Sequence, residues 1–191
     1  DVFTCGAKPL FFLDYIGVGR LLPEMAEALV KGVTQACEAV GCSLIGGETA
    51  ELPGIYPEDG FDLAGFAVGV VEKDAILEGS TIAEGDVLLG IPSNGLHTNG
   101  YSLARRVLRL EDDPSVLGRN HPELGGTLWD ALMEPHRCYY PMLEPVLHLI
   151  KGMAHITGGG LPENVPRVLP KGLGAWFDTS TWEVPPIFGM I

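Results

Sequence analysis

The sequence lacks the long apolar run that a membrane-spanning helix needs, about 20 consecutive residues, although 46% of its 191 residues are hydrophobic. Its first residues, DVFTCGAKPLFFLDY, have no basic head of the kind that begins a secretory signal. Basic residues are few as well: 12 Lys and Arg stand against 25 Asp and Glu, a net charge of −13, and they form no dense patch. A membrane span is therefore excluded, and nucleic acid is not expected as a partner.

Cysteine is scarce and shows no metal-binding or redox spacing. The four cysteines, Cys5, Cys37, Cys42 and Cys138, include no C-x-x-C pair, which argues against zinc and predicts reduced thiols of a cytoplasmic protein. Glycine and proline, in contrast, are abundant, with 26 and 15 residues. In so hydrophobic a chain they indicate tight turns and close backbone approaches rather than disorder.

Strand and helix patterns alternate along the chain, which predicts an α/β or α+β fold with layered packing. Strands are predicted at residues 9–13, 42–45, 61–71, 86–91 and 173–178, and helices at 21–40, 102–110, 127–133, 141–150 and from the glycines at 158–160 to residue 169. A polar, irregular stretch at 72–84 predicts two domains, residues 1–72 and 73–191. Because the patterns at both ends stop in mid-course, we expect the chain to be the middle of a longer protein.

Two loops, residues 91–102 and 155–164, share the order apolar strand, glycine-rich turn, helix start. The N–H groups and positive dipole at a helix start attract phosphate, and glycines let its oxygens approach the backbone. His97 and His155 are able to donate to, or protonate, a phosphate oxygen, whereas His121, His136 and His148 are expected to be incidental. Neither loop fits the known phosphate-loop or dinucleotide motifs, so an ordinary capped turn stays open as the alternative for each.

A third feature is the pair of acids that follows the strand predicted at 42–45, in the stretch Gly46-Gly47-Glu48-Thr49-Ala50-Glu51. Asp1 and Asp14 bracket the earlier strand. Carboxylates at strand ends suit Mg²⁺, a hard cation that would also let so acidic a protein bind a polyphosphate. The alternative is that Glu51 or Asp14 merely caps a turn or faces water.

Four sequence blocks together resemble the aminoimidazole ribonucleotide synthetase family, the phosphoribosylformylglycinamidine cyclo-ligases of purine biosynthesis. They are PLFFLDY (9–15), GCSLIGGETAELPG (41–54), GLHTNGYSLAR (95–105) and HITGGGLPENVPR (155–167), and the resemblance spans essentially the whole chain. It implies a two-domain α/β homodimer, in which the N-terminal sheets of two subunits form a central barrel with ATP in clefts along the interface, followed by a C-terminal α/β domain. The family's N-terminal ATP loop does not occur here, so both domains are expected to be incomplete.

The resemblance also implies a reaction: ATP phosphorylates the amide oxygen of formylglycinamidine ribonucleotide, and ring closure gives aminoimidazole ribonucleotide, ADP and phosphate. No protein nucleophile is required, and no nucleophile elbow is present. The implied catalytic residues are His97, Asn99 and His155. The resemblance implies that the nucleotide is bound by Asp1, Glu48, Gly46, Gly47 and Thr49. Of these, Asp1 and Glu48 are the implied ligands of Mg²⁺. The substrate phosphate is expected to be held by Ser93, Gly95, Thr157, Gly158, Gly159 and Gly160.

Two alternatives stay open beside the cyclo-ligase. One is another ATP-dependent enzyme of the same fold, of the selenophosphate synthetase or thiamine monophosphate kinase type. The other is a non-catalytic fragment used for dimerisation or phosphate binding.

Overall fold

The computed structural model describes residues 1–191, and the chain forms two compact units. The first comprises Asp1–Thr81 and Tyr139–Met153, and the second Ile82–Cys138 and Ala154–Ile191. None of the helices combines the length and the apolar character needed to cross a membrane.

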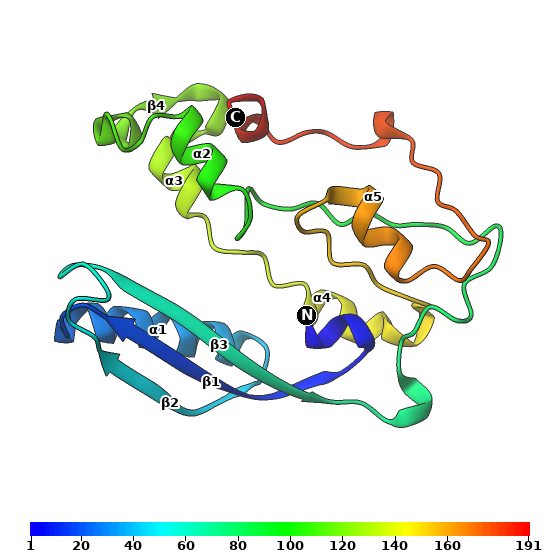
Figure 1. Ribbon diagram of the computed structural model, residues 1–191. Coiled ribbons are helices and arrows are strands. Elements are labelled where there is room, and N and C mark those ends of the chain that lie inside the picture. The colour runs from blue at the N-terminus through cyan, green and yellow to red at the C-terminus, as the bar shows by residue number, and fades with distance from the viewer. The chain divides into compact units, whose positions relative to one another are not determined.

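The first unit is built on a three-stranded sheet with one helix on one face (Figure 1). The central strand β1 (Lys8–Val18) pairs in parallel with β2 (Ser43–Glu51) and antiparallel with β3 (Phe61–Val70). Two parallel neighbours require a crossover, which α1 (Pro23–Ala39) supplies. Ile16 and Val18 of β1 are fully buried and Cys37 of α1 nearly so. The sheet is open, with β2 and β3 as its edges, and it closes no barrel within the chain.

Strand β2 contains a bulge that the sequence analysis did not anticipate. Phe12 of β1 pairs with Leu44, but the next residue, Leu13, pairs with Gly46, so that Ile45 is an extra residue in β2. Gly46 has φ of 145°, in a region that a side chain disfavours. Beyond the bulge the strand continues to Glu51. The predicted end of this strand at residue 45 is therefore wrong.

Segment 139–153 returns to the first unit as α4 (Tyr140–Leu143) and the 3₁₀ helix η5 (Glu144–Leu149). The ring of Tyr140 meets the ring of Phe3 edge-on, at a centroid distance of 4.9 Å. Phe3 belongs to η1 (Val2–Cys5), which precedes β1. A second short 3₁₀ helix, η2 (Lys73–Ala75), follows β3.

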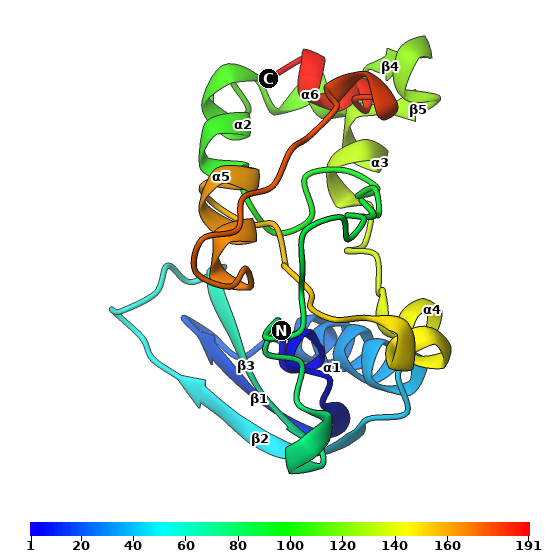
Figure 2. The same cartoon turned by 90° about the vertical axis from the view of Figure 1, so that its right-hand side faces the viewer.

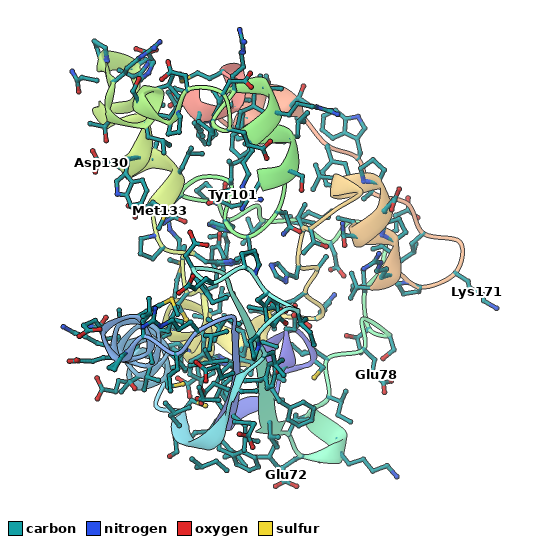
Figure 3. The ribbon with its side chains drawn as sticks, turned by 60° about the vertical axis from the view of Figure 1, so that its left-hand side comes forward. Glu72, Glu78, Tyr101, Asp130, Met133 and Lys171 are labelled. Atoms are coloured by element: carbon teal, nitrogen blue, oxygen red, sulfur yellow. The ribbon has the colours of Figure 1, made fainter.

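The core of the second unit is formed by short helices. The cluster of Leu128, Leu132 and Ile187 joins α3 (Leu128–Met133) to α6 (Pro186–Gly189), and Tyr101 of α2 (Tyr101–Val107) packs against it. The Tyr101 hydroxyl donates to the Leu132 carbonyl at 2.6 Å. Figure 2 labels α2, α3 and α6 of this unit, and Figure 3 shows Tyr101 at the start of α2.

The remaining elements of the second unit are also short. Two two-residue strands, β4 (Asn120–His121) and β5 (Gly126–Thr127), form a small ribbon beside η3 (Pro114–Gly118) and η4 (Pro122–Leu124). Further along the chain lie α5 (Gly160–Asn164), η6 (Val165–Arg167) and η7 (Thr179–Thr181).

Two predicted strands of this unit are absent from it: neither 86–91 nor 173–178 belongs to a strand. Val87 and Leu89 are more than 80% exposed, as is Trp176. A strand exists only where a neighbour accepts and donates its backbone hydrogen bonds, and nothing in the unit pairs with these segments. The two segments are apolar, but the strands that this composition predicts do not form.

Close packing at a glycine gives a test of the sheet. A Cβ on Gly65 of β3 would lie 2.0 Å from the ring of Phe12, whereas one on Gly32 of α1 would meet nothing within 4 Å. We expect Gly65→Ala to lower the free energy of unfolding by about 1–3 kcal/mol through overpacking. Gly32→Ala is the control and should raise it by about 0.5–1 kcal/mol because alanine favours helix. Urea denaturation followed by circular dichroism measures both, and an unchanged Gly65→Ala protein would contradict the packing described.

Candidate functional site: two loops and a histidine cluster

The first loop turns sharply around His97. Gly95 is buried with φ of 147°, and Gly100, the residue before α2, has φ of 86°. His97 itself has φ of 57°, one of only two non-glycine residues with positive φ. This left-handed conformation costs about 1–2 kcal/mol for a residue with a Cβ, so other contacts must hold His97 in place.

The side chain of Asn94 provides these contacts. Its Nδ2 donates to Glu134 Oε1 at 3.1 Å and to the Pro135 carbonyl at 2.8 Å, and its Oδ1 accepts from the Arg137 N–H at 3.2 Å. Because two of these partners are acceptors and one is a donor, they identify which atom of the Asn94 amide is the oxygen and which is the nitrogen. The same Oδ1 lies 2.5 Å from His97 Nε2.

The orientation of Asn94 determines the tautomer of His97. Since Oδ1 accepts only, its 2.5 Å contact with the ring favours the neutral tautomer that has the proton on Nε2 and the lone pair on Nδ1. The backbone N–H of Asn94 also points at this nitrogen, 3.2 Å away, and only the other tautomer would accept it there. With the proton on Nε2, a neutral His97 would accept a proton at Nδ1, whereas the sequence predicts that it donates to, or protonates, a phosphate oxygen.

His136 stands between the two predicted histidines. Its ring stacks on His97 with a centroid distance of 3.9 Å and an interplanar angle of 23°, and it meets His155 edge-on at 5.9 Å. His136, which the sequence predicts to be incidental, thus lies in contact with both histidines of the predicted site. Periodicity gave no signal for it, because the contact joins residues 39 positions apart.

Partial burial favours the neutral form of these imidazoles: His97 and His155 are half-buried, and His136 is more exposed. Burial lowers the pKa of His97 below its ordinary value, and the charge of Arg137 and the proximity of His155 lower it further. Burial is also the main cause that lowers the pKa of His136, with His97 and His155 adding to it. The pKa of His155 is lowered by burial as well. The cluster is thus a set of proton acceptors at neutral pH.

The second loop is held by a buried asparagine. Asn164 is 2% exposed, and its Nδ2 donates to the carbonyls of Gly160 at 2.8 Å and Gly158 at 3.2 Å. Its Oδ1 accepts from the Thr157 hydroxyl at 3.2 Å. Gly159 has φ of 90°, and a Cβ there would collide with the Glu163 carboxylate. Gly159 is therefore required by the turn itself, whereas a Cβ at Gly158 would meet nothing within 4 Å.

The structure brings some of the predicted loop residues together and leaves others apart. His97 and His155 meet through His136, whereas Asn99 is exposed and its N–H bonds to the Leu96 carbonyl. Ser93 and Thr157 are half-buried. The helices α2 and α5, with seven and five residues, are short, so the support that a helix dipole gives to an anion is small.

The predicted nucleotide residues Gly46, Gly47, Glu48 and Thr49 lie inside β2 and not in a loop beyond it. Glu48 pairs with Tyr15 and Gly47 with Asp14, and because side chains alternate along a strand, Glu48 and Asp14 face opposite sides of the sheet. Glu48 and Tyr15 border a shallow depression of about 370 Å³ on the sheet. Asp14 lies on the side of α1, close enough to Cys37 that its charge helps to raise the pKa of that thiol, after burial and Cys42.

The other two acids have separate positions. Glu51 accepts a hydrogen bond from the Leu21 N–H at 2.8 Å, which is the capping alternative left open by the sequence. Asp1 precedes η1, near the start of β1 at Lys8. Glu48 pairs with Tyr15, which lies seven residues further along β1. No group of three or more His, Cys, Asp or Glu side chains is arranged to hold a metal ion. The chemistry of Glu48, an exposed carboxylate beside an open depression, suits Mg²⁺.

Comparison with known proteins covers both units. Residues 1–71 match "AIR synthase related protein, N-terminal domain" and residues 83–191 match "AIR synthase related protein, C-terminal domain". Among curated relatives, a phosphoribosylformylglycinamidine cyclo-ligase of Desulfitobacterium hafniense is 51% identical over the whole of this chain and 56% of its own length. One of Burkholderia cenocepacia is 54% identical over 98% of this chain and 53% of its own length. A solved thiamine monophosphate kinase of Aquifex aeolicus aligns over 77% of this chain and 44% of its own, with 19% identity and a TM-score of 0.44. The chain thus spans just over half the length of these curated relatives.

The lowered histidine pKa values predict a pH dependence of stability. An imidazole whose pKa falls on folding binds fewer protons folded than unfolded, so stability rises with pH below about 6.5 and is lost as the pH falls through that range. We expect the free energy of unfolding to decrease from pH 7 to pH 5, and to decrease less in His136→Gln. The exposed His148 provides the control, since His148→Gln should keep the wild-type slope. Equal slopes in all three proteins would contradict a cluster whose neutral form is favoured by folding.

Proposed function

Because the chain belongs to the AIR synthase related protein family, we propose that it is part of an ATP-dependent cyclo-ligase. The enzyme would close formylglycinamidine ribonucleotide to aminoimidazole ribonucleotide and release ADP and phosphate. Relatives more than 50% identical carry the cyclo-ligase name. The meeting of the loops of His97 and His155 through His136 is the observation of the structure that supports the proposal.

The chemistry sets what the site must do. An amide oxygen is a poor leaving group and a phosphorylated one is good, so ATP activates the amide before the second nitrogen attacks. The work of the protein is to hold the γ-phosphate and the amide in line and to stabilise the charge that develops. This requires no protein nucleophile.

The residues of the second unit would serve the substrate. In the proposal His97 accepts, at Nδ1, the proton that the attacking nitrogen releases, and His155 and Asn99 orient the reacting amide. Gly158, Gly159 and Gly160 let the substrate phosphate approach the backbone, with Thr157, Ser93 and Gly95 beside it. The fixed turn around Asn164 supports this role, because its carbonyls are already bonded to the amide of Asn164.

The residues of the first unit would serve the nucleotide. Glu48, with Gly46, Gly47 and Thr49, is proposed to face ATP across the depression in the sheet, and Glu48 would hold the Mg²⁺. That ion would screen the phosphate charge in a protein of net charge −13. Asp1 stays a second predicted ligand. The boundary after residue 72 also stays a prediction.

A homodimer is the proposed assembly. Both edges of the three-stranded sheet are open, and Ile45 on β2 and Phe66 on β3 are 57% and 66% exposed. Open edges and exposed apolar side chains favour pairing with a second sheet. We place the enzyme in the cytoplasm, in keeping with four cysteines that are all free.

The reaction itself provides the test. A polypeptide of the relatives' full length that contains this sequence should convert formylglycinamidine ribonucleotide and Mg-ATP into aminoimidazole ribonucleotide, ADP and phosphate in equal amounts. Coupled ADP detection and chromatography of the product measure both. A kinase of the thiamine monophosphate type would leave that substrate unchanged and consume ATP with its own. Failure to consume ATP with any of these substrates would favour the non-catalytic alternative.

The proposed metal role of Glu48 gives a sharper prediction. In the same polypeptide, Glu48→Gln should lower ATP turnover by about tenfold or more, and added Mg²⁺ should restore part of it, because a charged oxygen ligand is replaced by a neutral one. Glu51→Gln on the same strand is the control: its acceptor for the Leu21 N–H is kept, and turnover should stay near wild type. Unchanged turnover and Mg²⁺ dependence in Glu48→Gln would reject the assignment.

A further inference from the structure

We infer that His136 is a positioning residue, whose ring holds His97 in the plane and tautomer in which Nδ1 accepts a proton. The inference rests on the proposed function for its role in catalysis, and on the geometry of the second unit for the positioning itself. It goes beyond the residues that the family resemblance implies, which do not include His136.

His97 is held from two directions. At its edge, Asn94 Oδ1 lies 2.5 Å from Nε2, and across its face the His136 ring stacks at 3.9 Å and 23°. An edge contact alone lets a ring rotate about the axis through that contact. A parallel ring against the face removes this rotation, and the two contacts together define one orientation.

One short segment supplies both contacts. Residues 134–137 carry the Glu134 and Pro135 oxygens and the Arg137 N–H that orient Asn94, and they carry His136 between them. The Arg137 guanidinium also donates to the Pro92 carbonyl at 3.1 Å, which ties the segment to the start of the His97 loop. His136 is therefore fixed to the same frame as the amide that selects the tautomer.

His97 needs this help. Its left-handed backbone is unfavourable, and its loop is followed by a helix of only seven residues. His136 also separates His97 from His155, which it meets edge-on at 5.9 Å. Removing the ring would leave space into which either imidazole could turn.

The experiment compares His136→Ala, which removes the ring, with His136→Phe, which keeps a flat ring but no nitrogen. Nitrogen NMR of the histidine side chains, without substrate, reports the tautomer of His97. We expect the Nε2-protonated form in the wild type and in His136→Phe, and a mixture of tautomers in His136→Ala. His148→Ala is the control, since His148 is exposed in the other unit, and it should leave the His97 signals unchanged.

Kinetics of the full-length polypeptide give the second readout. His136→Ala should lower kcat about tenfold or more, because misplacing a catalytic group by a fraction of an ångström is costly, and KM for ATP should change less than about twofold. His136→Phe should recover most of kcat.

Either variant is able to overturn the inference. Wild-type kcat and an unchanged His97 tautomer in His136→Ala would do so. If that protein fails to fold, His136→Phe decides: a tenfold loss of kcat with the His97 tautomer intact would show that the nitrogens of His136 matter and that positioning does not. Absence of cyclisation by the wild type would overturn the proposed function instead, and the NMR comparison would still decide the positioning.

Discussion

The geometry of the candidate site depends on the side-chain amide of Asn94. One amide bonds to three groups of residues 134–137 and presents its oxygen to His97, so it joins segments some forty residues apart without help from a sheet. A carboxylate could not do this, because it has no donor for the Pro135 carbonyl. The contact of this oxygen with Nε2 favours one tautomer of His97, and the proton transfer proposed at Nδ1 depends on that tautomer.

The second loop repeats the same solution with different chemistry. Asn164 is buried and satisfies the carbonyls of a glycine turn that no strand or long helix could satisfy. In both loops an asparagine replaces regular secondary structure as the source of rigidity. The glycines then permit the turn, and the amide keeps it in one conformation. A site formed from loops thereby gains the precision that usually comes from helices and strands.

Local patterns could predict what local interactions decide. The apolar stripe and Pro23 predicted α1 over residues 21–40, close to its observed bounds, and the run from Phe61 predicted β3 almost to the residue. Residues 86–91 have the composition of a strand but not a partner, and the partner is not encoded in the segment itself. The sequence does not point to His136 for a related reason: stacking on a residue 39 positions away has no effect on the periodicity of apolar residues. The resemblance to the cyclo-ligases identified His97 and His155, whose proximity only the fold shows.

The extra residue in β2 reverses which alternate positions of the strand lie beneath α1. Leu44, before the bulge at Ile45, pairs with Phe12 and faces α1. Glu48, after the bulge, pairs with Tyr15 and faces the opposite side of the sheet, although both positions are even-numbered. A strictly regular strand that kept Leu44 against the helix would have carried the Glu48 carboxylate into the apolar layer as well. One inserted position therefore lets a single nine-residue strand contribute both to the hydrophobic interior and to an acidic surface on the far side.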